Sequence, residues 1–168
     1  PEGVQRLFSR LAEGDAPAQQ LAERAEARGL LEVIGAHSPF LSDLALREAA
    51  ALHRLLDRGP DEAMAAVLEP LTTADPGSPR EAVASLLRRA KRQGALLAAV
   101  ADLGALWPLD RVTGALSDLA DETIEFACAH LLLDAARRGQ ITLARAKGDK
   151  RQITKGSGLI VLGMGKLG

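Results

Sequence analysis

Hydrophobic residues in the first half of the chain recur every three or four positions, which is the spacing of amphipathic helices. Glycine, proline and aspartate interrupt this pattern repeatedly, because proline lacks a backbone donor and glycine tolerates a left-handed backbone. We therefore expect several short helices separated by turns. The predicted short helices cover residues 4–13, 18–34, 42–57 and 61–71. Ser42 is the predicted N-cap of the third helix, since its hydroxyl can accept a hydrogen bond from a first-turn amide.

Two longer helices are predicted next, over residues 80–106 and 109–138. Pro108 separates them, so we expect the two helices to turn back on each other as an antiparallel pair. Trp107 stands beside this proline, and we expect its ring to plug the corner rather than to bind a ligand. Gly139 is the predicted end of the second helix, because glycine is common just after a helix C-terminus.

The pattern changes after Gly139, where short β-prone stretches replace the helical spacing. The last of these stretches is a run of four apolar residues followed by glycine, which is typical of a buried strand. The predicted strands span residues 141–143, 151–154 and 159–162. The predicted fold class is therefore mainly α: a helical region over residues 1–139 leads into the first strands of a truncated α/β domain over residues 140–168.

Composition narrows the function classes. The 168 residues carry a net charge of -1 and only 2% aromatic side chains, which argues against nucleic-acid binding. Cys128 is the one cysteine, so a disulfide framework and a cysteine-based zinc site are excluded. We expect no membrane helix, because no apolar run reaches about 18 residues. No signal peptide is expected either, so a cytoplasmic location is predicted. Pro1 and Gly168 suggest that the sequence was cut from a longer chain.

The most informative segment is the glycine-rich turn Gly-Met-Gly-Lys-Leu-Gly at residues 163–168, directly after the last predicted strand. Glycines let backbone amides approach a phosphate closely, and a lysine adds positive charge. The candidate phosphate- or nucleotide-binding residues are Gly163, Gly165, Lys166 and Gly168. A purely structural turn is one alternative. A nicotinamide-dinucleotide fingerprint has the same glycine spacing, but it also requires a following helix and an acidic residue about 20 positions later.

Residues 158–168, Gly-Leu-Ile-Val-Leu-Gly-Met-Gly-Lys-Leu-Gly, resemble the start of the nucleotidyltransferase domain in the bacterial glutamine synthetase adenylyltransferase/adenylyl-removing enzyme family. Members of that family carry two such domains, and the turn is more similar to the amino-terminal, adenylyl-removing copy. The resemblance extends over most of the chain, through residues 36–41, 86–92 and 109–133. Ala90 and residues 94–95 depart from the family, in which bulkier or charged residues are common at these positions.

The resemblance implies that AMP is removed from an adenylylated tyrosine of glutamine synthetase by phosphorolysis, with release of ADP. A second domain would install AMP from ATP. Mg²⁺ is the implied cofactor, and glutamine synthetase and a PII-type nitrogen regulatory protein are the implied partners. The family holds Mg²⁺ with an Asp-x-Asp pair, and none follows Asp149 in this chain. The catalytic and metal-binding residues are therefore expected beyond Gly168, and the chain alone is expected to be inactive.

Two other functions stay open from the sequence: a helical protein-interaction module without catalysis, and a nicotinamide-dependent oxidoreductase. Other possible sites have simpler explanations. Two basic stretches are expected to be solvated helix or hairpin faces; they comprise Arg80, Arg88, Arg89, Lys91 and Arg92, and Arg145, Lys147, Lys150, Arg151 and Lys155. His37, His53 and His130 are too far apart for a local metal motif, and we expect His130 in or near the core. Cys128 is expected to be a small buried hydrophobic residue.

Overall fold

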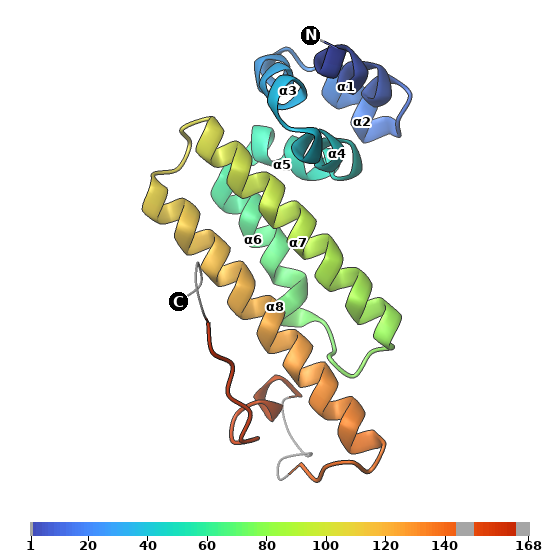
Figure 1. The fold of residues 1–168 in the computed structure, drawn as a ribbon, viewed down its shortest axis with the longest axis vertical. Coiled ribbons are helices and arrows are strands. Elements are labelled where there is room, and N and C mark those ends of the chain that lie inside the picture. Colours follow the sequence, from blue (N-terminus) through green and yellow to red (C-terminus); the bar gives the residue numbers. More distant parts are fainter. Residues whose placement is uncertain (1, 144–149, 164–168) are drawn as a thin grey trace. The chain divides into compact units, whose positions relative to one another are not determined.

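A computed structural model describes residues 2–143 and 150–163, and Figure 1 shows its ribbon. The described residues are mainly α-helical, which confirms the predicted fold class. The helices are α1 (Glu2–Ala12), α2 (Ala16–Glu23), α3 (Ala25–His37), α4 (Pro39–Arg47), α5 (Ala49–Arg58), α6 (Pro60–Thr73), α7 (Arg80–Leu103), α8 (Leu109–Arg137) and the 3₁₀-helix η1 (Lys150–Ile153). Among the described helices, none is both long and apolar enough to cross a membrane.

The chain divides into two compact units. The first unit comprises Pro1–Val67 and Lys91–Leu116, and the second comprises Leu68–Ala90 and Ser117–Gly168. Helices α6, α7 and α8 each contribute a segment to both units. The domain boundary predicted at residue 139 separates a helical region from the start of an α/β domain. The division into two compact units does not test this boundary, so it stays a prediction.

In the first unit, α1 and α3 cross at two glycines. Leu7 and Leu11 of α1 and Leu31 of α3 are almost fully buried there. A Cβ atom added at Gly35 would lie 2.9 Å from the Cα atom of Val4, which is closer than real Cβ contacts come. Gly3 faces Gly35 in the same way. The crossing therefore depends on the absence of side chains where the two backbones approach each other.

The single helix predicted over residues 18–34 is wrong, because the structure breaks it at Arg24. The backbone of Arg24 is extended, with φ −72° and ψ 118°, and separates α2 from α3. Its guanidinium group lies 2.7 Å from the Asp57 carboxylate of α5 and 3.7 Å from Glu26. Local helix propensity favours one continuous helix, and contacts with α5 accompany the break.

The single helix predicted over residues 42–57 is also wrong, because it is divided at Glu48 between α4 and α5. The Glu48 side chain is only 5% exposed. Its two carboxylate oxygens accept hydrogen bonds from Arg92 Nε at 2.6 Å and from Gln93 Nε2 at 2.8 Å, both on α7. A buried carboxylate requires such partners, so this break also coincides with a long-range polar contact.

The predicted cap of that helix is wrong by one turn. Ser38, not Ser42, is the N-cap of α4, and its hydroxyl accepts a hydrogen bond from the Leu41 amide at 3.1 Å. Pro39 starts the helix, a position where its missing donor costs nothing. Ser42 lies inside α4, and its hydroxyl donates to the Ser38 carbonyl at 2.9 Å.

The corner between α7 and α8 comes three residues earlier than predicted, because α7 ends at Leu103 rather than at residue 106. Ala105 adopts a left-handed backbone with φ 50°, and the Leu106 amide donates to the Ala101 carbonyl at 2.8 Å. Within the first unit, the second half of α7 and the start of α8 then run in opposite directions (Figure 1).

Trp107 is buried at this corner with 5% of its surface exposed, which confirms its predicted role as a plug. Its indole Nε1 donates to Asp61 Oδ2 at 3.3 Å, and the Arg111 guanidinium lies 4.6 Å from its ring centroid. Arg111 also donates to Asp61 Oδ1, from Nη2 at 2.9 Å. Hydrogen bonds from Arg111 and from Trp107 hold the pKa of the Asp61 carboxyl below its ordinary value of 3.8.

In the second unit, the loop after α6 is tied to α8. The buried ring of His130 donates from Nδ1 to the Pro76 carbonyl at 2.9 Å. Arg137 donates to the Gly77 carbonyl, also at 2.9 Å. His130 therefore lies in the core, as predicted, and its function there is to satisfy a buried carbonyl of the loop.

The strands predicted after Gly139 are not present in residues 141–143 and 150–163, so this part of the prediction is wrong for the described chain. Residues 150–153 form η1, and the apolar run at residues 159–162 is extended without pairing. The run is also largely exposed, with Ile160 and Leu162 each at 79%. A strand forms only when a neighbouring strand accepts its backbone hydrogen bonds, and the described residues supply none.

Candidate functional site

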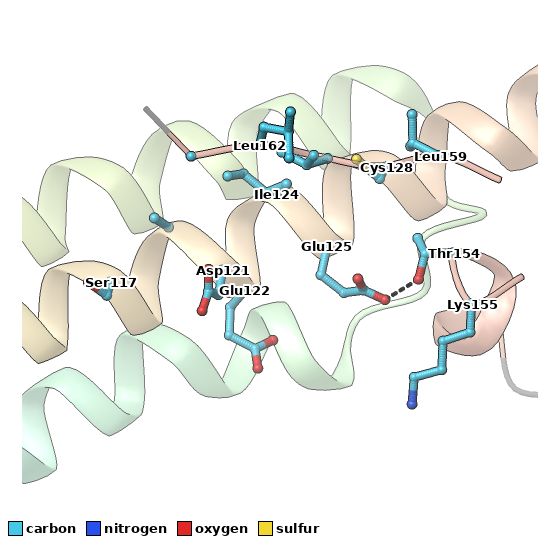
Figure 2. Close-up of a pocket in the computed structure, with 13 residues that line it drawn as sticks. Ser117, Asp121, Glu122, Ile124, Glu125, Cys128, Thr154, Lys155, Leu159 and Leu162 are labelled. Atoms are coloured by element: carbon cyan, nitrogen blue, oxygen red, sulfur yellow. Dashed lines mark hydrogen bonds between the residues drawn. The ribbon is translucent and has the colours of Figure 1, made fainter. Parts of the chain in front are cut away.

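A cavity in the second unit lies between α8 and the chain segment that follows η1 (Figure 2). Its volume is about 710 Å³. One wall is the face of α8 from Ser117 to Cys128, and the other wall is formed by Thr154, Lys155 and the apolar run that ends at Gly163. Leu162 lies beside Ile124, and Leu159 lies beside Cys128 (Figure 2).

The first candidate phosphate-binding residue, Gly163, lines this cavity and is exposed. Gly165, Lys166 and Gly168 lie outside the described residues, so the structure does not test whether the four residues form one site. The position of Gly163 shows that the glycine turn begins next to α8.

The α8 wall is acidic. Asp121, Glu122 and Glu125 line it, whereas Lys155 is the one basic side chain of the lining. Carboxylates repel phosphate, so an anion bound here would lie on the glycine side of the cavity. Residues 2–143 and 150–163 contain no group of three or more His, Cys, Asp or Glu side chains arranged to hold a metal ion.

The segment that leads to Gly163 is attached to α8 at one point. The Thr154 hydroxyl donates a hydrogen bond to the Glu125 carboxylate, and both side chains are half-buried (Figure 2). Ile153, immediately before it, is 6% exposed. The Ser157 hydroxyl donates to the Thr154 carbonyl at 2.8 Å and accepts from the Leu159 amide at 3.2 Å. These contacts connect α8 to the start of the apolar run.

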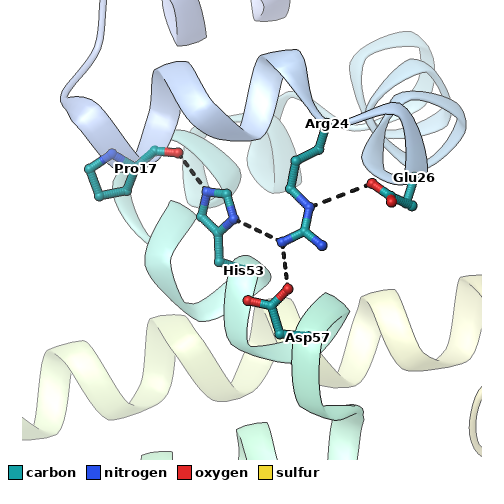
Figure 3. A network of polar contacts seen from close by, with 5 residues as sticks. All are labelled: Pro17, Arg24, Glu26, His53 and Asp57. Carbon is teal, nitrogen blue, oxygen red and sulfur yellow. Dashed lines mark hydrogen bonds and ion pairs between the residues drawn. The ribbon is translucent and has the colours of Figure 1, made fainter.

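A second polar cluster lies in the first unit (Figure 3). Because a carbonyl only accepts, His53 donates from Nε2 to Pro17 at 2.9 Å, and its Nδ1 then accepts from Arg24 at 3.3 Å. Arg24 also donates to Asp57 at 2.7 Å, and this hydrogen bond raises the pKa of the guanidinium further above its ordinary value. Every polar group shown is paired, so the cluster joins α2, α3 and α5 rather than presenting a reactive group.

The remaining candidates that the structure describes do not form a site, and Arg145 and Lys147 lie outside the described residues. Cys128 is half-buried and lines the cavity beside α8, so the prediction that it is a buried core residue needs correction. His37 is exposed on α3. In the basic stretch of α7, Arg88, Arg89 and Lys91 are exposed, as expected for a solvated face, whereas Arg92 pairs with Glu48.

Sequence reasoning missed the polar contacts that organise the molecule. Thr154 lies 29 positions from Glu125, and no local pattern connects them. Glu125 is one of several acidic residues on α8, which a sequence pattern assigns to solvent. The sequence does indicate that His53 and Asp57 lie on one face of α5, because residues four apart share a helix face.

Comparison with known proteins gives the family. The model of the family described as glutamate-ammonia ligase adenylyltransferase matches residues 28–168, which include the glycine turn. The chain belongs to this family. No solved structure matches it significantly.

Curated relatives of this adenylyltransferase-family chain carry the name bifunctional glutamine synthetase adenylyltransferase/adenylyl-removing enzyme. The one from Bradyrhizobium diazoefficiens is 40% identical over 142 residues, which are 84% of this chain and 14% of that protein. The one from Rhodopseudomonas palustris strain HaA2 is 38% identical over 159 residues, 94% of this chain and 16% of that protein. The one from Caulobacter vibrioides is 35% identical over 144 residues, 84% of this chain and 14% of that protein. The chain thus spans about a seventh of these relatives.

Proposed function

We propose that this chain is part of a bifunctional enzyme that regulates glutamine synthetase, and that it belongs to the adenylyl-removing half. That half would release AMP from an adenylylated tyrosine of glutamine synthetase by phosphorolysis and so produce ADP. The observation that carries the proposal is the family match, because it runs through the glycine turn at residues 163–168. The names of the relatives support both activities.

The glycine turn would hold the attacking phosphate. Its backbone amides can approach an anion closely because glycine has no side chain, and Lys166 would add a flexible point charge. The acidic α8 wall opposite Gly163 would repel an anion, so a phosphate in this cavity would have to bind on the glycine side.

Mg²⁺ and ATP belong to the proposal only through the family. Mg²⁺ neutralises charge that develops during phosphoryl transfer, and it needs carboxylates that converge on it. The described residues do not fit such a site, because no metal-holding group occurs among them and Glu125 of the acidic wall bonds to Thr154. We therefore expect the metal-binding carboxylates beyond Gly168. A PII-type regulatory protein and a cytoplasmic location are further parts of this proposal.

The alternatives from the sequence are less well supported. The glycine spacing at residues 163–168 also fits a nicotinamide-binding domain, but the matched family and the three relatives described above are adenylyltransferases. Those relatives are named as enzymes, which disfavours an interaction module without catalysis.

The test is phosphate-dependent release of ADP from adenylylated glutamine synthetase by a full-length protein that contains this chain. We expect Gly165→Val to abolish release with an unchanged melting curve, because a branched side chain prevents close backbone approach to phosphate. Lys166→Ala is expected to have a milder effect. The 168-residue chain alone should show no turnover with Mg²⁺ present. Full activity of folded Gly165→Val would contradict the phosphate role, and turnover by the chain alone would contradict the location of the chemistry.

A further inference from the structure

Residues 159–163 have little burial to hold them in place. Leu159 and Val161 are 50% and 53% exposed, and Ile160 and Leu162 are exposed further. Apolar contact with α8 therefore stabilises this run only weakly. The contacts that fix its beginning come just before it, where Ile153 is buried and Thr154 is bonded to Glu125.

The connection from this point to the apolar run is short and well bonded. Gly156 and Gly158 both have left-handed backbones, with φ 78° and φ 82°. The Ser157 amide donates to the Thr154 carbonyl at 3.3 Å and closes a turn over residues 154–157. Ser157 bridges this turn by donating to the Thr154 carbonyl and accepting from the Leu159 amide. A displacement of Thr154 would thus be passed to Leu159 and onward to Gly163.

We infer that Thr154 and Glu125 are positioning residues for Gly163, the first residue of the proposed phosphate-binding turn: their hydrogen bond fixes the start of the segment that places Gly163 against α8. This inference rests on the proposed function for its phosphate readout. Neither residue needs to touch the substrate, and both act through the backbone between Thr154 and Gly163.

Glu125 could affect phosphate binding either by its negative charge or by holding Thr154, and these two explanations can be distinguished by experiment. If the acidic wall acted only by repelling phosphate, removing the carboxylate would strengthen phosphate binding and lower its KM. If Glu125 acts by holding Thr154, removing it loosens the turn and raises the KM for phosphate. The two explanations therefore predict changes of opposite sign for Glu125→Ala.

The experiment measures phosphate-dependent ADP release by the full-length protein and, in parallel, hydrogen–deuterium exchange of the amides at residues 155–163. Thr154→Val keeps the side-chain shape and removes the donor. We expect it to raise the KM for phosphate about three- to tenfold with little change in kcat, the range for losing one hydrogen bond, and to accelerate exchange. Thr154→Ser keeps the hydroxyl and should restore the KM to within about twofold. Glu125→Gln keeps an acceptor and should resemble the wild type more than Glu125→Ala does.

Asp121→Asn is the matched control. Asp121 lines the same wall one helical turn earlier, and among the described residues it makes no hydrogen bond to the segment after η1. Its neutralisation should leave exchange at residues 155–163 unchanged and should not raise the KM. A Thr154→Val variant with wild-type KM and wild-type exchange would overturn the inference, as would a lowered KM in Glu125→Ala. A wild-type protein without phosphate-dependent release would instead overturn the proposed function, while the exchange data would still decide whether Thr154 holds the segment.

Discussion

Replacing Trp107 by alanine tests whether the corner between α7 and α8 depends on packing. The ring is 95% removed from solvent, since 5% of the residue is exposed. Truncation of a buried tryptophan costs about 3–5 kcal/mol, through lost burial and the cavity left behind. Asp61 and Arg111 beside the ring are 71% and 37% exposed, so water can enter part of the space. We therefore expect a cost near the lower end, about 3 kcal/mol.

Two further variants separate the contribution of the Trp107 ring from that of its hydrogen bond to Asp61. Trp107→Phe keeps an aromatic ring but loses the Nε1 donor to Asp61. It should cost about 1 kcal/mol, because the exposed carboxylate regains water and part of the cation–π contact remains. Leu109→Ala is the matched control, since Leu109 is a large apolar residue on the same corner but is 72% exposed. It should change stability by less than about 0.5 kcal/mol.

Urea unfolding of the 168-residue chain, followed by far-ultraviolet circular dichroism, measures all three variants. Fluorescence is unsuitable because Trp107 is the chain's one tryptophan. With a urea slope of about 2 kcal/mol per molar, Trp107→Ala should lower the midpoint by roughly 1.5 M. A midpoint equal to that of Leu109→Ala would refute the packing argument. A loss in Trp107→Phe as large as in Trp107→Ala would show that the hydrogen bond, not the ring, holds the corner.

Three further changes probe other contacts of the first unit by the same unfolding measurement. Gly35→Ala should lower the free energy of unfolding by more than about 2 kcal/mol, because the added Cβ meets the α1 backbone. Gly29→Ala, in open space on the same helix, should raise it by about 0.5–1 kcal/mol. Equal effects of the two variants would contradict the close approach of α1 and α3 at Gly35. Glu48→Ala should lower the free energy of unfolding by about 2–3 kcal/mol. This is less than the loss expected for a fully buried ion pair, because the Arg92 partner is 38% exposed. An unchanged stability would refute the role of the Glu48 carboxylate in the helix break. The pKa of Asp61 is lowered, chiefly by its hydrogen bond with Arg111, so the ionised carboxylate stabilises the fold above its unfolded pKa, and this contribution disappears as the pH falls through the folded pKa. Between about pH 4 and pH 2 the wild type should therefore lose more stability than Asp61→Asn. Equal losses in the two proteins would contradict this prediction.

The sequence by itself determined several of the helix boundaries in the described chain. Gly59 and Pro60 end α5 and start α6, and α8 ends at Arg137, two residues before Gly139. These signals are local: proline removes a donor, and glycine accepts the left-handed backbone that follows a helix. The sequence also predicted correctly that Trp107 is buried at the corner, because Pro108 interrupts the helix and a large aromatic side chain gains free energy from burial.

Only the tertiary structure decided the two helix breaks. Arg24 and Glu48 stand in sequences with good helix propensity, and nothing near them in the chain signals an interruption. Their partners, Asp57 and Arg92, lie 33 and 44 positions away. A contact between such a charge and a distant partner is of the same order as the few tenths of a kcal/mol by which propensity favours one backbone state over another, so it can offset that preference.

The tertiary structure likewise decided what happens around the candidate site. Four apolar residues before Gly163 predict a buried strand, yet the described chain leaves them unpaired and exposed along α8. The bond between Thr154 and Glu125 that places this segment has no local sequence signal. Hydrophobic spacing indicates which side chains avoid water. A strand, however, needs a partner backbone, and a hydrogen bond needs a partner atom. Both partners come from residues that only folding brings together.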